Sequence, residues 1–371
     1  MTWADLPEGG RLLLTILATI LVLGVLILVH ELGHFWAAKA VDIEVPRFSI
    51  GLGPKLLGIR RGETEYVISW FPLGGYVKMA GMADEEAMGR LEGGVETERE
   101  PSPRDFEAKP LWARVVVICA GVAMNLLFAF AAFTLLAAVE GVTEPVVSEV
   151  REGTPAETAG LQVGDRLHSI GGKRVRDTFQ VPLLIQERAG EEIPVVVERG
   201  EIRLTLKATP APVTRYREAE NDSVQVGILG IGVGRHRSVG LLEAVGAGAR
   251  KTANWSYMVV DFLGQLVTGR SSARDLGGPI MIGQISGAAA RAGLWSLLGF
   301  MAIISVNLAI LNLLPIPILD GGHLIFLLVE GVRGRALSVE QRLRLSQVGL
   351  VVVAGIMVWA IGNDILRLLG I

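Results

Sequence analysis

Hydrophobic residues along this chain of 371 residues are gathered into four long runs, with mixed or polar segments between them. The four runs cover residues 12–29, 115–139, 294–314 and 348–369. A helix needs about 20 apolar residues to cross a hydrocarbon core of roughly 30 Å, and each run is near that length. The pattern therefore predicts a polytopic α-helical membrane protein with about four transmembrane helices.

The first run could instead be a cleaved signal peptide. Signal peptides carry positive charge before the apolar stretch, whereas here Asp5 and Glu8 outweigh Arg11. Cleavage would also remove the polar motif that ends this run. We therefore interpret the run as a retained helix.

The composition agrees with a membrane protein and does not indicate a nucleic-acid-binding or disulfide-linked protein. Half of the residues are hydrophobic and the formal net charge is −3, so no basic excess indicates nucleic acid as a partner. The single cysteine, Cys119, excludes an intramolecular disulfide.

The orientation in the membrane follows from the lysines and arginines of the connecting segments. Eleven of them lie between residues 30 and 114 and four between residues 333 and 344, whereas the segment before the first run has one. Because basic connections favour the cytoplasmic side, both termini and the segment 140–290 are predicted to lie outside.

A polar motif, His30-Glu31-Leu32-Gly33-His34, ends the first run. Residues i and i+4 share one face of a helix, so the two histidines can bind one metal ion together. Glu31 lies beside them, where a carboxylate can act as a general base. The alternative is a polar helix end that only reaches the membrane interface, but buried polar groups in a span are costly unless they have a partner or a function.

A catalytic zinc needs a third protein ligand, and Asp320 is the best candidate. It ends the third run within the sequence NLLPIPILDGGH, which starts at Asn312. The first and third runs cross in the same direction, so His30 and Asp320 reach the same, cytoplasmic side. Two alternatives stay open: Asp320 could simply end a helix before a Gly-Gly turn, and His323 could compete as the ligand. We favour His323 as a structural neighbour or a residue that hydrogen-bonds a ligand.

These motifs resemble the site-2 protease family, and within it the bacterial regulator-of-sigma-E-protease type. Matching blocks continue through FSIGLGP at 48–54, PLGGYVKM at 72–79, Phe106, Lys109 and Arg114, and GGPI at 277–280. The resemblance implies that His30, His34 and Asp320 bind zinc, that Glu31 is the catalytic base, and that Asn312 lies near the scissile peptide of the substrate. One departure is that Val122 follows Ala-Gly in the second run, where family members often have proline.

The resemblance also implies the biology. It predicts a zinc metalloendopeptidase of the bacterial cytoplasmic (inner) membrane, with its active site toward the cytoplasm. The substrates would be single-span membrane proteins, first trimmed by another protease in some cases, such as anti-sigma factors or signal-peptide remnants.

Segment 43–79 mixes β-branched and aromatic residues with glycines and prolines, which predicts strands and turns. The family implies a membrane-associated β-region here, whose edge strand could hold an unwound substrate. The alternative is a surface hairpin that only connects the first two helices.

Segment 143–210 has the composition of a soluble α/β domain, and its Gly-Leu-x-x-Gly-Asp sequence at 160–165 resembles a PDZ domain. Such domains bind extended peptides at a strand edge. Residues 239–268 have helical spacing and suit a helix on the outer membrane surface. The predicted organisation is an N-terminal membrane core (1–142), one PDZ-like domain (143–210), a linker with an outer amphipathic helix (211–290) and a C-terminal membrane core (291–371).

Two functions from other classes compete with a protease. A catalytically inactive adaptor would recruit partners through the PDZ-like domain, and it predicts the loss of Glu31 or of a ligand. A metal transporter would bind ions between helices near the midplane rather than beside a general base.

Overall fold

The computed structural model describes residues 8–82, 100–217, 222–270 and 277–369. The chain forms two compact units. The first comprises residues 1–132 and 255–362, and the second comprises residues 133–254 and 363–371.

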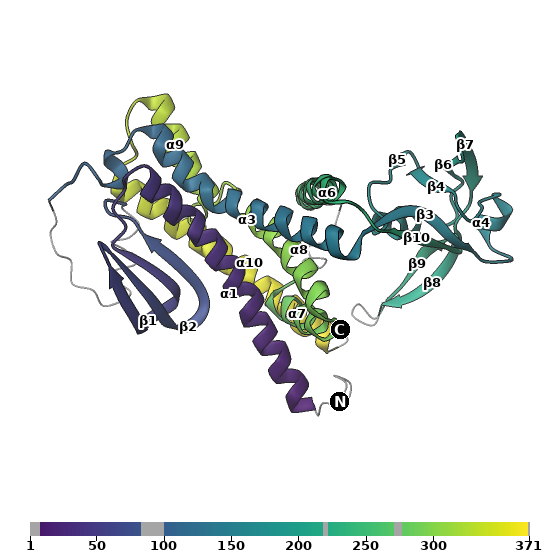
Figure 1. The fold of residues 1–371 in the computed structure, drawn as a ribbon, viewed down its shortest axis with the longest axis horizontal. Helices are drawn as coiled ribbons and strands as arrows, with labels where there is room; N and C mark the ends of the chain where they lie inside the picture. The colour runs from purple at the N-terminus through teal and green to yellow at the C-terminus, as the bar shows by residue number, and fades with distance from the viewer. Residues whose placement is uncertain (1–7, 83–99, 218–221, 271–276, 370–371) are drawn as a thin grey trace. The chain divides into compact units, whose positions relative to one another are not determined.

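Helices make up most of the first unit (Figure 1). They are α1 (Glu8–Ala40), the 3-10 turn η2 (Phe106–Ala108), α3 (Leu111–Glu140), α7 (Pro279–Ala292), α8 (Leu294–Asn312), α9 (Asp320–Arg333) and α10 (Val339–Leu368), of which α3 and α10 cross the division between the units. Among the described residues, α1, α3, α8 and α10 are long and apolar enough to cross a membrane. The prediction of about four spanning helices is confirmed to that extent.

Small residues allow α7 to lie close against α1. A Cβ atom added at Gly287 would come within 2.9 Å of the Thr15 Cβ, and one at Gly283 would come within 3.4 Å of the Thr19 hydroxyl. The two threonine hydroxyls donate to backbone carbonyls one turn earlier in α1. This small-residue crossing is typical of helices that pack in a membrane.

The predicted strands form a compact mixed sheet from two long, bent segments, β1 (Arg47–Arg61) and β2 (Thr64–Lys78). Residues 47–50 pair on one side with 65–68 and on the other with 75–78, while 55–61 pair with 64–69. The arms therefore lie in the order 55–61, 64–69, 47–50 and 75–78, which makes 75–78 an edge strand among the residues that the structure describes. β1 bends at Gly51 and Gly53, whose φ angles of 90° and 88° favour glycine.

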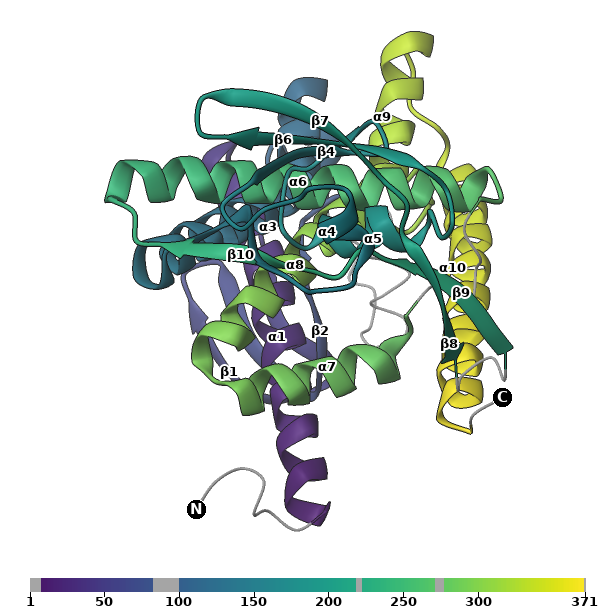
Figure 2. The same ribbon diagram turned by 90° about the vertical axis from the view of Figure 1, so that its right-hand side faces the viewer.

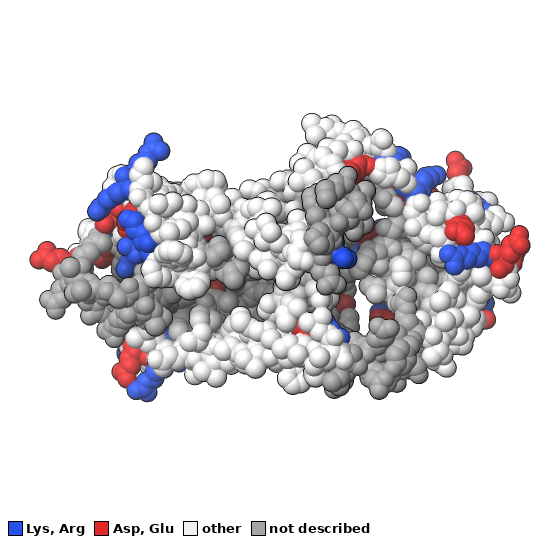
Figure 3. Space-filling view, turned by 90° about the horizontal axis from the view of Figure 1, so that it is seen from below, with Lys and Arg blue, Asp and Glu red and all other residues white. Residues whose placement is uncertain are grey.

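Aromatic rings fix this sheet against the end of α1. The ring centroid of Phe35, the residue after His34, lies 5.4 Å from that of Phe48 and 5.9 Å from that of Tyr66. The arm 55–61 and the bend after 64–69 instead expose large apolar side chains, among them Ile59, Trp70 and Phe71. On the face drawn in Figure 3, the helices of this unit have a largely uncharged surface, and its charged side chains gather at the end that carries β1 and β2.

The second unit is built around a six-stranded sheet (Figure 2). Five strands follow the order β10-β3-β4-β6-β7, and β5 pairs with β4. Their bounds are β3 Val142–Val150, β4 Arg166–Ile170, β5 Lys173–Arg174, β6 Ile193–Arg199, β7 Ile202–Ala208 and β10 Ile231–Arg237. The sheet thus continues beyond residue 210, because β10 pairs with β3.

Short elements complete this unit: α4 (Pro155–Thr158), α5 (Gln180–Gln186) and a hairpin of β8 (Ala211–Arg217) with β9 (Asp222–Ile228). Its core is a contiguous cluster of buried side chains that includes Leu167, Val195 and Leu229. Asp165, the last residue of the Gly-Leu-x-x-Gly-Asp sequence, is buried and accepts hydrogen bonds from Arg199. Segment 239–268 forms one helix, α6 (Leu241–Val267), which crosses the division between the units.

Candidate metal centre

Among the described residues, one group of three side chains has the composition of a metal site: His30, His34 and Asp320. Their candidate ligand atoms all lie within 4.8 Å of one another. The two histidine Nε2 atoms are 3.1 Å apart, and Asp320 places one oxygen 3.2 Å from His30 Nε2 and the other 3.5 Å from His34 Nε2. The structure therefore brings together the three residues that the sequence proposed as ligands.

The spacing of these atoms fits a zinc ion. Zinc bonds of about 2.0–2.1 Å in a tetrahedral arrangement place the ligand atoms roughly 3.3 Å apart. Both histidines are buried, with 8% and 6% of their surface exposed. Asp320 Oδ2 is also buried and receives no hydrogen bond of good geometry from the described residues, which is consistent with a position facing a cation. Three ligands leave a fourth position open, as in catalytic rather than structural zinc sites.

The histidines come from adjacent turns of α1, and Asp320 is the first residue of α9. The loop before α9 is tightly folded, and Ile318 has a φ of 111°, which is strained for a β-branched residue. The two glycines after Asp320 are required by close packing. A Cβ atom at Gly321 would come within 2.5 Å of the Leu313 carbonyl carbon, and one at Gly322 within 2.6 Å of Pro317 Cα. The Asp-Gly-Gly sequence thus lets the loop return beneath the start of α9.

A second pair of glycines allows α3 to cross α1 at the histidines. A Cβ atom at Gly121 would lie 2.7 Å from His30 Cε1 and would also collide with the His34 ring. On the other helix, a Cβ atom at Gly33 would lie 2.7 Å from both the Ala120 carbonyl carbon and the Met124 side chain. Gly121 is therefore part of the wall of the site, which the sequence reasoning had not identified.

The outer ring nitrogens of both histidines bond to α3. His34 Nδ1 lies 2.9 Å from the carbonyl oxygen of Val117, and His30 Nδ1 lies 3.1 Å from the side-chain amide of Asn125. These bonds orient both Nε2 atoms toward Asp320. The polar residue Asn125 within an apolar run was the one signal in the sequence that could have indicated this contact.

Glu31 lies next to the cluster and contacts the edge strand of the small sheet. Its carboxylate accepts a hydrogen bond from the backbone N–H of Val77. A Cβ atom at Gly75, on the same strand, would lie 3.4 Å from Glu31 Cγ. The candidate base is therefore positioned between the metal cluster and the edge strand at 75–78.

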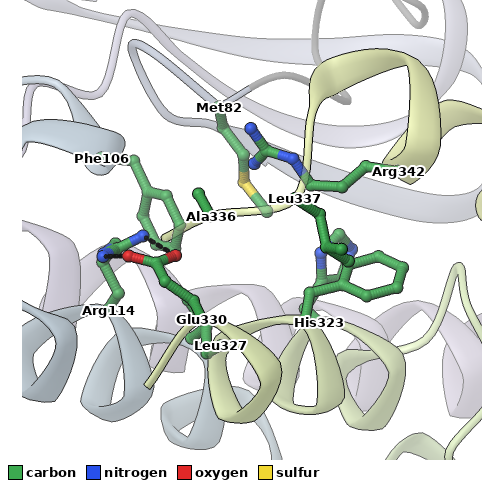
Figure 4. A pocket seen from close by; sticks show the side chains of 10 residues that line it. Met82, Phe106, Arg114, His323, Leu327, Glu330, Ala336, Leu337 and Arg342 are labelled. Atoms are coloured by element: carbon green, nitrogen blue, oxygen red, sulfur yellow. Dashed lines mark hydrogen bonds and ion pairs between the residues drawn. The ribbon is translucent and has the colours of Figure 1, made fainter. Parts of the chain in front are cut away.

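The other two candidates, Asn312 and His323, occupy different surroundings. Asn312 Nδ2 lies 3.4 Å from His30 Nε2, so Asn312 borders the cluster. His323 is not in the cluster of three, and its ring packs at 5.9 Å against Phe326. It lines a pocket of about 430 Å³, including its open mouth, beside α9 (Figure 4).

One wall of that pocket is an ion pair that the sequence reasoning did not identify (Figure 4). Arg114, at the start of α3, binds Glu330, near the end of α9, through both terminal nitrogens; one of these contacts is 2.9 Å. Arg114 is buried, with 7% of its surface exposed. The pair holds α9, which carries Asp320, against α3.

A bundle of apolar helices that encloses two histidines and an aspartate defines a membrane-embedded metalloenzyme as the class of this protein. The chain belongs to peptidase family M50, whose model matches residues 18–356. It is 37% identical over 361 residues to Atu1380 of Agrobacterium fabrum, which is named as a zinc metalloprotease, and the match covers 95% of each chain.

Two Bacillus proteins are similar over nearly their whole length. The chain is 30% identical over 423 aligned positions to the zinc metalloprotease RasP of Bacillus licheniformis and to the regulator of sigma-W protease RasP of Bacillus subtilis. Each match covers 95% of this chain and 99% of the relative. The protein is thus a zinc metalloendopeptidase of the site-2 protease type, as the sequence motifs predicted, and zinc is its cofactor.

Proposed function

We propose that this protein is an intramembrane endopeptidase that cuts single-span membrane proteins within or near their transmembrane segment. The observation that carries the proposal is the buried cluster of His30, His34 and Asp320 beside a span and the edge strand of a small sheet. A peptidase of this kind participates in regulated intramembrane proteolysis. Anti-sigma factors are a fitting substrate class, because one relative is named as a regulator of sigma-W protease. Signal-peptide remnants are a second class with the same single-span form.

In this proposal His30, His34 and Asp320 hold the zinc. Zinc, when bound, supplies a Lewis acid that polarises a carbonyl and acidifies water. Glu31 takes the proton from the attacking water and passes it to the leaving amine. Its contact with Val77 places this carboxylate at the strand edge where a peptide would arrive.

The substrate must be unwound, because a helix keeps its peptide bonds within its own hydrogen-bonding ladder. We assign the binding of the unwound segment to the edge at 75–78, where an extended substrate adds as a further strand. Asn312, which borders His30, then donates from its side-chain amide to the substrate backbone near the bond that is cut.

The proposed location is the bacterial inner membrane, with the metal cluster toward the cytoplasm. The exposed apolar side chains of β1 and β2 would contact the membrane, since exposed apolar patches favour such contact. The sheet of the second unit, which we propose is PDZ-like, and α6 would lie outside. Their contribution would be selection of substrates rather than chemistry. A metal transporter or an inactive adaptor explains neither the carboxylate of Glu31 beside the cluster nor its contact with a strand edge.

The test is cleavage of a purified single-span protein by the full-length enzyme in liposomes, with mass spectrometry of the fragments. We expect new termini within or within a few residues of the transmembrane segment, and loss of cleavage on chelation with restoration by zinc. Cleavage confined to soluble loops, or cleavage that persists without zinc, would contradict the proposal.

A further inference from the structure

Asn125 is a fully buried amide in the middle of α3, with 0% of its surface exposed. Its side-chain nitrogen Nδ2 lies 3.1 Å from Nδ1 of the His30 ring, and the amide oxygen is the end that points away. The other end of the amide has no hydrogen-bond partner among the described residues. Burying an amide in an apolar span costs free energy unless the amide makes hydrogen bonds. The contact with His30 is therefore expected to have a structural or functional role.

The explanation lies in the proton on the imidazole ring. A histidine that binds a metal presents a lone pair at one nitrogen and carries its proton on the other. His30 Nε2 faces Asp320 and His34, so the proton belongs on Nδ1, which faces Asn125. A protonated Nδ1 needs an acceptor, and an amide can present its oxygen by turning about its last bond.

His34 also directs its Nδ1 atom toward α3, and the group that it meets there can only accept a hydrogen bond. Its Nδ1 lies 2.9 Å from the backbone carbonyl of Val117, which only accepts. Val117 and Asn125 are eight residues apart on α3, roughly two turns, and therefore lie on the same face. One helix thus supplies the outer acceptor for both candidate ligands.

We propose that Asn125 is a positioning residue for the metal centre: its side-chain oxygen accepts the Nδ1–H of His30 and fixes the tautomer in which Nε2 faces the zinc. The inference rests on the proposed ligand set. α8 holds Asn125 in place from behind, because the hydroxyl of Ser305 donates to the Asn125 backbone carbonyl at 2.8 Å. Ser305 is itself fully buried, with 0% of its surface exposed, and does not touch the histidine through its hydroxyl.

The experiment compares full-length Asn125→Leu, Asn125→Asp and Ser305→Ala with the unchanged protein. Zinc affinity is measured by competition with a chromophoric chelator, and the d–d spectrum of the cobalt-substituted protein reports the ligand geometry. Asn125→Leu, which removes the acceptor at similar volume, should weaken zinc binding about 10–100-fold. Asn125→Asp keeps an acceptor and should bind zinc at least as tightly as the unchanged protein. Ser305→Ala alters the packing of α8 against the same residue of α3 and should stay within about twofold.

Three results would overturn the inference. One is wild-type zinc affinity and cobalt spectrum in Asn125→Leu. Another is loss of zinc from Asn125→Asp when the metal-free proteins melt at the same temperature, since this would make the amide a donor. The third is equal loss in Ser305→Ala, which would assign the effect to helix packing. If Asn125→Leu does not fold, the zinc affinity of Asn125→Asp tests whether the side chain at this position acts as an acceptor.

The same assay separates this inference from the proposed metal site. Asp320→Ala serves as the reference for loss of a ligand. If Asp320→Ala loses zinc and Asn125→Leu binds zinc as the unchanged protein does, the proposed ligands stand and only the role of Asn125 is contradicted. If Asp320→Ala binds zinc fully, the proposed ligand set is contradicted, and the role of Asn125 is contradicted with it.

Discussion

The metal cluster of the first unit and the sheet of the second unit both bury polar groups, but they satisfy them differently. In the cluster, the histidines of α1 bond to α3, at Val117 and Asn125, and face Asp320 of α9. In the sheet, Asp165 accepts from Arg199, at the end of β6, and from the backbone of its own loop. The cluster thus depends on the crossing of three helices, whereas the polar centre of the sheet is complete within one small domain. Changes at helix crossings should therefore alter zinc binding, and changes in the sheet should not.

The largest expected effect is at the crossing of α1 and α3. Gly121→Leu places a side chain where both histidine rings lie, so zinc binding should weaken by more than about 100-fold. Gly24→Leu is the matched control, because a Cβ atom at Gly24 would meet nothing within 4 Å. Metal analysis of the purified proteins measures the effect. Equal zinc content in both variants would show that α1 and α3 do not pack closely at the two histidines.

The second prediction concerns the ion pair that holds α9. Glu330→Gln leaves the Arg114 charge buried without its partner, which should destabilise the protein by about 3 kcal/mol. Glu340→Gln removes a partner from the exposed pair with Arg344 and should cost about 0.5 kcal/mol or less. Thermal unfolding in detergent compares the two. Similar small shifts would mean that the pair does not stabilise the packing of α9.

The third prediction removes the sheet. Arg237 pairs with Val142, so the two ends of the domain meet, and a short glycine-serine linker can replace residues 142–237. Zinc content should be unchanged. If the domain selects substrates, the rate for an untrimmed substrate relative to its trimmed form should rise roughly tenfold, which corresponds to 1.4 kcal/mol of selection. An unchanged ratio would assign the domain to a structural or partner-docking role.

The smallest effect on the metal site is expected at Asp165, where a substitution should change only the stability of the sheet. Bonds from Arg199 and the Gln162 N–H overcome the effect of burial and lower the pKa of the Asp165 carboxyl. A pKa lowered in the folded state stabilises the fold above the unfolded pKa of about 3.9, and this contribution is lost as the pH falls. Asp165→Asn should cost about 1.5–3 kcal/mol near neutral pH and reduce the loss of stability in acid. Urea unfolding at several pH values measures both, and zinc content at neutral pH should not change.

Some of this architecture could be predicted from the sequence because it depends on local periodicity. The i, i+4 spacing of His30 and His34 determines a shared helix face, and the position of Asp320 after the third run placed it at the same depth. The spans were predictable for the same reason, since length and hydropathy are local properties.

The remaining features depend on contacts between distant segments. The register of α3 on α1, which brings Gly121 and Asn125 to the histidines, is determined by side-chain packing and by no pattern within either helix. The order of the four arms of β1 and β2 depends on bends at glycines. β10 joins the sheet through pairing with β3, about 80 residues earlier in the chain, and no local pattern indicates such a contact.

In the proposed mechanism, Glu31 takes part in the chemistry while His30, His34 and Asp320 hold the metal. The most direct measurement is zinc content and substrate cleavage, determined side by side, for Glu31→Gln and Asp320→Ala. We expect that Glu31→Gln retains zinc but cleaves nothing, and that Asp320→Ala loses both zinc and cleavage, because two histidines alone bind zinc weakly. Full cleavage by Glu31→Gln would contradict the assigned base. Full zinc content with normal activity in Asp320→Ala would contradict the ligand set and make His323 the first alternative to test.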